Sequence, residues 1–118
     1  MRRREVIKLI AGSAAVWPLA ARAQLAREAS INIGVLTDMT GIFATLAGEG
    51  SVVAAHMAVE DFGGEVLGRK IRVLTGDHKH KAEVASAITN HWFNDDHVGM
   101  VVDMPNSVVA LAMQKLAA

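Results

Sequence analysis

Residues 101–111 read VVDMPNSVVAL, and this stretch decides the fold because a strand gives way to a helix inside it. Two valines lead into Asp103, and Pro105 ends a strand because proline has no backbone N–H to donate to a sheet. Asn106 and Ser107 both belong to the residue types that cap helices, and an apolar run follows them. The stretch therefore predicts a strand over His97–Asp103 and a helix over Ser107–Ala117.

Two more strand–helix units precede this one. Ser30–Thr37 (SINIGVLT) and Lys70–Thr75 (KIRVLT) alternate in polarity and are rich in Ile and Val, which predicts strands. The segments after them carry apolar residues at helical spacing. They predict helices over Gly48–Phe62, with an apolar stripe of Val52, Ala55, Val59 and Phe62, and over Lys81–Asn94, with Ala85, Ile88 and Trp92 in the core.

Three strand–helix units in succession predict an α/β fold, a parallel sheet with helices on both faces. In such sheets ligands bind beyond the carboxyl ends of the strands. Three loops reach that edge: Asp38–Leu46, Asp77–His80 and Asp103–Asn106. The helix that begins at Asn106 or Ser107 points its backbone N–H groups and its dipole at the same edge, which suits a carboxylate. Helix capping alone also explains these two residues.

The amino-acid composition excludes several classes of function. The chain has 118 residues, enough for one domain of ordinary size, with 52% hydrophobic and 20% charged residues. It has no cysteine, which excludes disulfides, zinc–thiolate sites and a thiol nucleophile. Its formal net charge is zero, but residues 1–23 are basic and the remainder has a net charge of about −4. No basic stripe remains, so nucleic acid is not an expected partner.

The first 23 residues predict a secretory signal peptide, with cleavage after Ala23. A basic start is followed by an apolar run and then by Ala21-Arg22-Ala23, which has small residues at the two positions that a signal peptidase reads. A membrane anchor or a first helix of the fold is the alternative. The run RREVIK at residues 3–8 is similar to the twin-arginine export signal but has Val6 where that signal has Phe, so the general secretory route stays open.

Four stretches resemble the start of a known family. They are the export signal, INIGVLTDMTGIFATLAGEG, AAHMAVEDFGG followed by LGRKIRV, and VVDMPNSVVALA. Together they resemble the type I periplasmic substrate-binding proteins of ABC transporters, the branched-chain amino acid receptor or leucine-binding-like family. The resemblance implies that residues 24–118 form part of the amino-terminal lobe of a solute-binding domain. In that family two α/β lobes, joined by a hinge, close on the ligand.

The resemblance also implies a site. Ser107 falls where the family uses a serine hydroxyl and nearby N–H groups to hold the ligand's carboxylate, and Asn106 lies beside it. The wall of the pocket is expected from the loop of Phe43, Ala44, Thr45 and Leu46.

The implied function is the capture of a small solute, an amino acid or a related carboxylate or amide, in the periplasm and its delivery to a membrane permease. No catalysis, cofactor or metal is expected. Because the resemblance covers only the opening part of the fold, a chain that ends at Ala118 is expected to bind its solute poorly, since burial from both sides is missing.

Other interpretations of the sequence are weaker. Asp38 and Asp103 follow strands as the acids of a phosphorylated receiver domain do, but Met39 stands where a second acid is needed, and strand-end aspartates are usually turn formers. His78 and His80 could bind a metal, but no clear third ligand is present, and a solvated loop is the simpler prediction. An exported α/β fragment that needs a partner chain for stability also remains open.

Overall fold

The computed structural model describes residues 19, 21–22, 25 and 30–118. Residues 31–118 form a compact unit. The predicted signal peptide falls almost wholly outside the described residues, and its cleavage after Ala23 stays a prediction. Among the described residues, no helix has both the length and the apolar character that crossing a membrane requires.

The compact unit contains every strand and helix that the sequence predicts, each with ends within two residues of the prediction. Pro105 lies between the last strand and the last helix, as its missing N–H demands. The elements in chain order are β1 (Ile31–Thr37), α3 (Gly48–Phe62), β2 (Glu65–Val66), β3 (Arg69–Asp77), α4 (Ala82–Asn94), β4 (Val98–Val102) and α5 (Ser107–Ala117).

The short strand β2 was not predicted. It forms a hairpin with the start of β3, in which Glu65 pairs with Lys70 and Val66 with Arg69. Leu67 and Gly68, between the strands, both have positive φ angles, as a two-residue hairpin turn requires. Sequence periodicity missed this strand because two residues carry no alternation.

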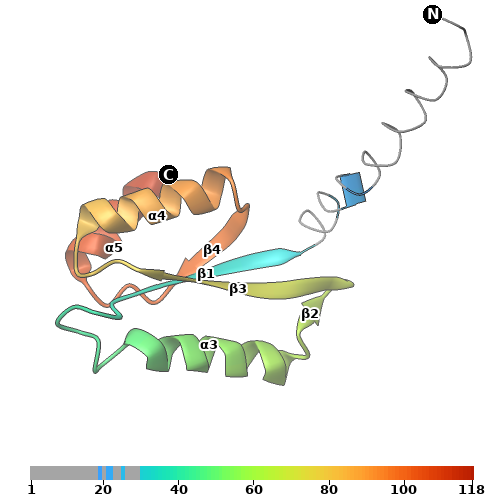
Figure 1. The fold of residues 1–118 in the computed structure, drawn as a ribbon, viewed down its shortest axis with the longest axis horizontal. Helices are drawn as coiled ribbons and strands as arrows, with labels where there is room; N and C mark the ends of the chain where they lie inside the picture. The colour runs from blue at the N-terminus through green and yellow to red at the C-terminus, as the bar shows by residue number, and fades with distance from the viewer. Residues whose placement is uncertain (1–18, 20, 23–24, 26–29) are drawn as a thin grey trace, which may run out of the picture. The chain divides into compact units, whose positions relative to one another are not determined.

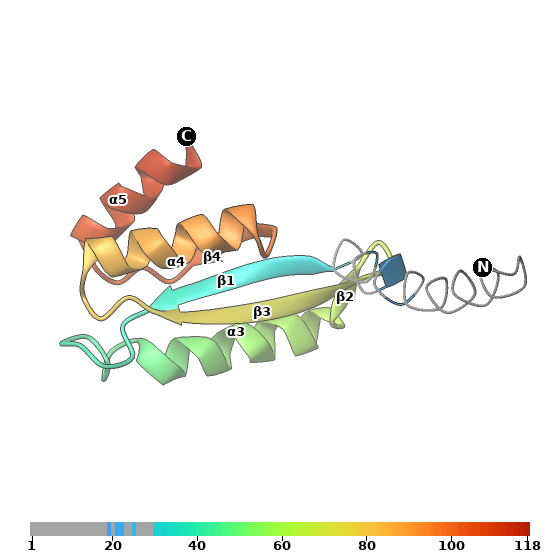
Figure 2. The ribbon, with the colours of Figure 1, turned by 45° about the horizontal axis from the view of Figure 1, so that its top comes forward.

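The four strands lie in the order β2-β3-β1-β4. β1 pairs in parallel with both β3 and β4, which confirms the predicted parallel sheet, and only β2 is antiparallel. The crossover from β1 to β3 and the one from β3 to β4 run in opposite directions across the sheet, and right-handed crossovers then place their helices on opposite faces. Figures 1 and 2 show α3 on one face and α4 and α5 on the other.

The hydrophobic core lies on the face that α4 and α5 cover. Trp92 is 5% exposed and packs with Ile88 against the sheet, so the prediction that both belong to the core is confirmed. Gly34 and Gly76 make room for this packing, since a Cβ at position 34 would collide with the Trp92 ring and one at position 76 would collide with Ile88 and crowd the Trp92 ring. The other buried members of this core are Leu36, Ala85, Val98, Val109 and Met113.

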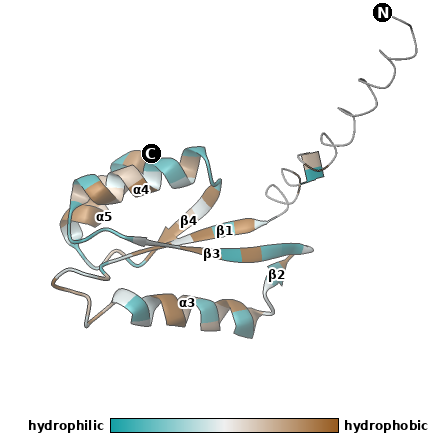
Figure 3. Cartoon of the chain, viewed as in Figure 1, coloured by the Kyte–Doolittle hydropathy of each residue, from teal (hydrophilic) through white to brown (hydrophobic). Residues whose placement is uncertain are grey.

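The opposite face is thinly covered. Three residues of the predicted apolar stripe on α3, Val52, Ala55 and Val59, are half-buried, whereas the fourth, Phe62, is 64% exposed. α3 packs chiefly against β1 and β3, and its last turn gains little cover from them. Figure 3 shows hydrophobic residues along β1 and β4, whereas the start of β3 is hydrophilic.

Candidate functional site

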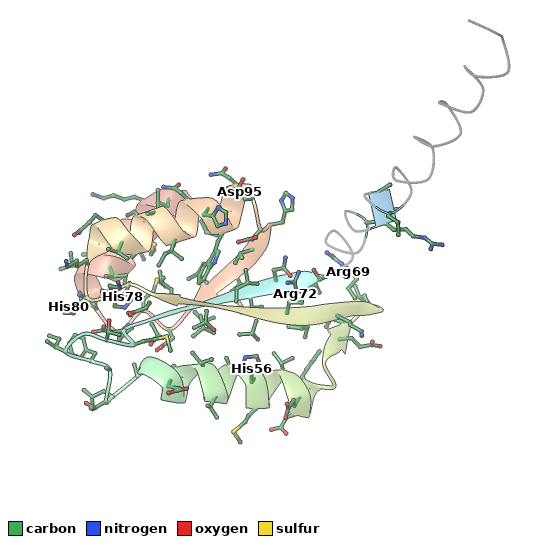
Figure 4. All side chains as sticks on the ribbon, viewed as in Figure 1. His56, Arg69, Arg72, His78, His80 and Asp95 are labelled. Atoms are coloured by element: carbon green, nitrogen blue, oxygen red, sulfur yellow. The ribbon has the colours of Figure 1, made fainter. Side chains whose placement is uncertain are left out.

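The carboxyl ends of β1, β3 and β4 meet at one edge of the sheet. The register places Thr37 beside Asp77 and Val35 beside Val102, so the loops that follow these strands are neighbours. Figure 4 shows His78 and His80 at this end of β3, with Arg69 and Arg72 toward the other end. The edge predicted for ligand binding is therefore built from the three predicted loops.

Asp38 organises the first loop. Its side chain is fully buried, and its two carboxylate oxygens accept hydrogen bonds from the backbone N–H groups of Gly41 (2.7 Å) and Phe43 (3.0 Å). Glycine is required at position 41 because a Cβ there would collide with the Asp38 carboxylate. The prediction that this aspartate forms a turn is confirmed, and the turn it forms holds Phe43 in place.

Asp77 joins the first loop to the second. Its Oδ1 accepts from the N–H groups of Met39 (3.0 Å) and Lys79 (2.9 Å), and its Oδ2 accepts from the Thr40 hydroxyl (2.7 Å). Partial burial raises the pKa of Asp77, but the hydrogen bonds from Thr40, Lys79 and Met39 outweigh it and bring the pKa below its ordinary value. The carboxylate is therefore ionised at neutral pH and fastens the two loops together.

The prediction that His78 lies on a solvated loop was wrong, because its side chain is fully buried. β3 continues through Asp77, and the alternation of side chains along a strand turns His78 toward the same face as Gly76, which faces α4. His78 Nδ1 accepts from the backbone N–H of His80 at 3.0 Å. His78 Nε2 then carries the ring proton, and this buried N–H has no hydrogen-bond partner among the described residues.

Asn106 caps α5. It is buried, and its Oδ1 accepts from the backbone N–H of Val108 at 2.9 Å, so of the two predicted caps the asparagine is the actual one. Its Nδ2 lies 3.0 Å from His80 Nδ1. Ser107 is the first residue of the helix and is exposed. Its hydroxyl is thus placed at the helix start without serving as the cap.

The structure brings together some of the predicted site residues. Phe43 and Asn106 both contact His80, whose ring centroid is 5.3 Å from that of Phe43. Ala44 is half-buried in the same loop, whereas Thr45 and Leu46 are exposed. His80 is the residue that the sequence did not single out for the site. Its loop was assigned to this edge, but the direction of its side chain depends on backbone angles that the sequence does not show.

Helix capping yields a stability prediction. Replacing Asn106 by Ala is expected to lower the free energy of unfolding by about 1 kcal/mol or somewhat more, because the N–H of Val108 loses its acceptor. Ser107→Ala, one position along, is the matched control and should stay within about 0.5 kcal/mol. Urea unfolding followed by circular dichroism measures both. Equal losses in the two variants would mean that Asn106 does not act as the cap.

The described residues contain no group of three or more His, Asp or Glu side chains arranged to hold a metal ion.

A groove of about 480 Å³ lies between α4 and α5 and is lined mainly by apolar side chains, among them Val108, Leu111 and Leu116. Its lining residues belong to the two helices and not to the three loops of the carboxyl edge.

Known protein families and solved structures include proteins that are similar to most of this chain. Residues 30–118 match the family model of periplasmic binding proteins. A solved periplasmic binding protein from Burkholderia mallei is 40% identical, with a TM-score of 0.75, over 77% of this chain and 24% of that one. A branched-chain amino acid ABC transporter periplasmic ligand-binding protein from Burkholderia xenovorans is 41% identical, with a TM-score of 0.72, over 75% of this chain and 24% of that one.

A more distant solved structure contains a ligand. It is the solute-binding protein of an ABC transporter from R. palustris in complex with benzoate, 26% identical, with a TM-score of 0.64, over 75% of this chain and 24% of that one. No match was found among curated protein sequences. The chain thus spans about a quarter of the length of the solved proteins that it matches.

Proposed function

This chain belongs to the periplasmic binding protein family, and we propose that it is the solute-binding part of an ABC importer, which captures a small carboxylate at the carboxyl edge of its sheet. The observation that carries this proposal is the start of α5. Asn106 caps the helix, Ser107 is exposed beside it, and the ring pair of Phe43 and His80 lies next to the cap.

Physical chemistry favours a carboxylate at this place. The first N–H groups of an α-helix have no partner within the helix and carry part of its positive dipole. One of them, from Val108, is satisfied by Asn106. Ser107 adds a hydroxyl that can donate to an anion, and the Phe43 ring offers an apolar wall for the rest of the solute. Binding of this kind makes and breaks no covalent bond, so the proposed function is capture and delivery and not catalysis.

The location of the protein, its partner and its solute are also proposed. An extracytoplasmic location, in the periplasm, fits the family and the signal peptide predicted at residues 1–23. The partner that receives the solute would be the membrane permease of the importer. The solutes considered are a branched-chain amino acid, after the relative from B. xenovorans, and an aromatic carboxylate, after the relative from R. palustris.

Ligand-dependent stability tests this function. A solute that binds only the folded chain raises its unfolding temperature, by an amount that grows with solute concentration. We expect sodium benzoate or isoleucine at high concentration to raise the unfolding temperature of the 118-residue chain, measured by circular dichroism. Benzamide, which has the shape of benzoate without its charge, and sodium chloride at matched ionic strength should not.

Ser107→Ala is expected to reduce this stabilisation but to leave the unfolding temperature of the free chain unchanged. The cap of α5 is made by Asn106, and the Ser107 hydroxyl takes no part in it. Equal stabilisation of the wild type and of Ser107→Ala would remove Ser107 from the site. No stabilisation by either solute would contradict the proposed function for this chain.

A further inference from the structure

We propose that His80 is a specificity-determining residue that donates a hydrogen bond to the carboxylate of the solute. This inference rests on the proposed function and adds a residue to its site. Three observations carry it. The backbone at Lys79 and His80 has positive φ angles, one nitrogen of the His80 ring can donate, and the side chain contacts Asn106 while it remains 37% exposed.

The loop that presents His80 is strained. Lys79 and His80 have φ angles of 52° and 58°, in the left-handed region that residues other than glycine rarely adopt. Such a backbone conformation is strained for any residue with a Cβ atom. Three hydrogen bonds hold the pair: Asp77 Oδ1 accepts from the N–H of Lys79, His78 Nδ1 accepts from that of His80, and the His78 carbonyl accepts from that of Lys81. These hydrogen bonds, one of them accepted by the fully buried His78, fix the direction of His80.

The cap of α5 sets the hydrogen-bonding state of the His80 ring. Asn106 Oδ1 must accept from Val108, which turns the NH₂ group of Asn106 toward His80. Nδ2 lies 3.0 Å from His80 Nδ1 and 3.4 Å from Nε2. An NH₂ group can only donate, so we assign Nδ1, the nearer ring nitrogen, as the acceptor, which places the proton of a neutral ring on Nε2. That N–H is the donor that we assign to the solute.

The surroundings of the ring fit a small carboxylate with an apolar body. The rings of Phe43 and His80 are 5.3 Å apart and tilted by 49°, so they form one continuous wall. The His80 side chain is 37% exposed, whereas Asp38, whose Oδ2 lies 4.0 Å from His80 Nδ1, is fully buried. Both carboxylate oxygens of Asp38 accept hydrogen bonds from backbone N–H groups, so this buried side chain is not available to a solute. The exposed part of His80 therefore offers a donor and a ring face next to the start of α5.

His80→Asn and Lys79→Asn form a matched pair of variants. Asparagine tolerates the left-handed backbone at both positions, and the Lys79 side chain is exposed. Nuclear magnetic resonance titration of the 118-residue chain with sodium benzoate gives the affinity. Loss of a hydrogen bond to a charged group predicts that His80→Asn binds benzoate about tenfold more weakly or worse. Lys79→Asn should bind like the wild type, and in the wild type the ¹⁵N resonance of His80 Nε2 should shift on binding.

The outcomes separate this inference from the function on which it rests. Weakening by Ser107→Ala with no effect of His80→Asn, and no shift of the Nε2 resonance, would overturn the role of His80 and leave the carboxylate site at α5 standing. Equal weakening by His80→Asn and Lys79→Asn would show that the loop, and not the imidazole, matters, which also overturns the inference. A wild-type chain that binds neither benzoate nor isoleucine would overturn both.

Discussion

Trp92→Ala is expected to remove a large part of the folding stability of this chain. Trp92 is 5% exposed, and its ring fills the space that Gly34 and Gly76 leave over the sheet. Truncation leaves a cavity that neither glycine can fill, and such changes cost about 3–5 kcal/mol. Domains of this size are stable by only about 5–15 kcal/mol in total. Urea unfolding followed by far-ultraviolet circular dichroism measures the loss.

Phe62→Ala is the control for this change, because it also removes an aromatic ring from a helix but from a position that is 64% exposed. It should alter the free energy of unfolding by about 0.5 kcal/mol or less. If Trp92→Ala unfolded at the same urea concentration as Phe62→Ala, the core would not lie between α4 and the sheet.

Asp38→Ala has the second largest expected effect. The fully buried carboxylate is the acceptor for the N–H groups of Gly41 and Phe43. Removing it leaves both donors without a partner, at about 1–3 kcal/mol each when they stay dry. Water can reach part of this loop, so we expect a loss of about 2–4 kcal/mol in the free energy of unfolding. The loop that carries Phe43 should also lose its fixed position.

Thermal unfolding and the amide resonances of Gly41 and Phe43 measure the two effects of Asp38→Ala. Asp61→Ala, a change of the same kind at an exposed position of α3, is the control and should leave both unchanged. Asp38→Asn keeps one acceptor oxygen but places an NH₂ group where the second acceptor was, so its loss should be smaller than that of Asp38→Ala. A stable Asp38→Ala chain with unshifted Gly41 and Phe43 resonances would contradict the role given to this carboxylate.

Most of the fold could be predicted because its main elements are long and periodic. The predicted helix Ser107–Ala117 matches α5 at both ends, since proline and an asparagine cap mark its start. Which face of α5 is buried was harder to predict. The sequence pattern treats Val108, Leu111 and Met113 alike, yet Val108 and Leu111 are exposed and Val109 and Met113 are buried. An apolar helix gives no contrast from which to choose a face.

The site was only partly predictable, because tertiary contacts determine it. A cap at Asn106 or Ser107 could be predicted from their place after Pro105, and the structure shows that Asn106 is the cap. The burial of His78 and the direction of His80 could not. They depend on β3 continuing through Asp77 and on two left-handed residues after it, whereas the letters HKHK indicate a solvated loop. Whether Ser107, Asn106 and the loop from Phe43 to Leu46 bind a solute stays a prediction.

The location of bound benzoate on the 118-residue chain tests the central claim most directly. Amide chemical shifts recorded during a titration report that location residue by residue. The proposed function predicts that the largest shifts cluster at Phe43, at the side-chain amide of Asn106 and at Ser107, at the carboxyl edge of the sheet. Shifts confined to the groove between α4 and α5, around Leu111 and Lys115, or no shifts at all, would contradict it.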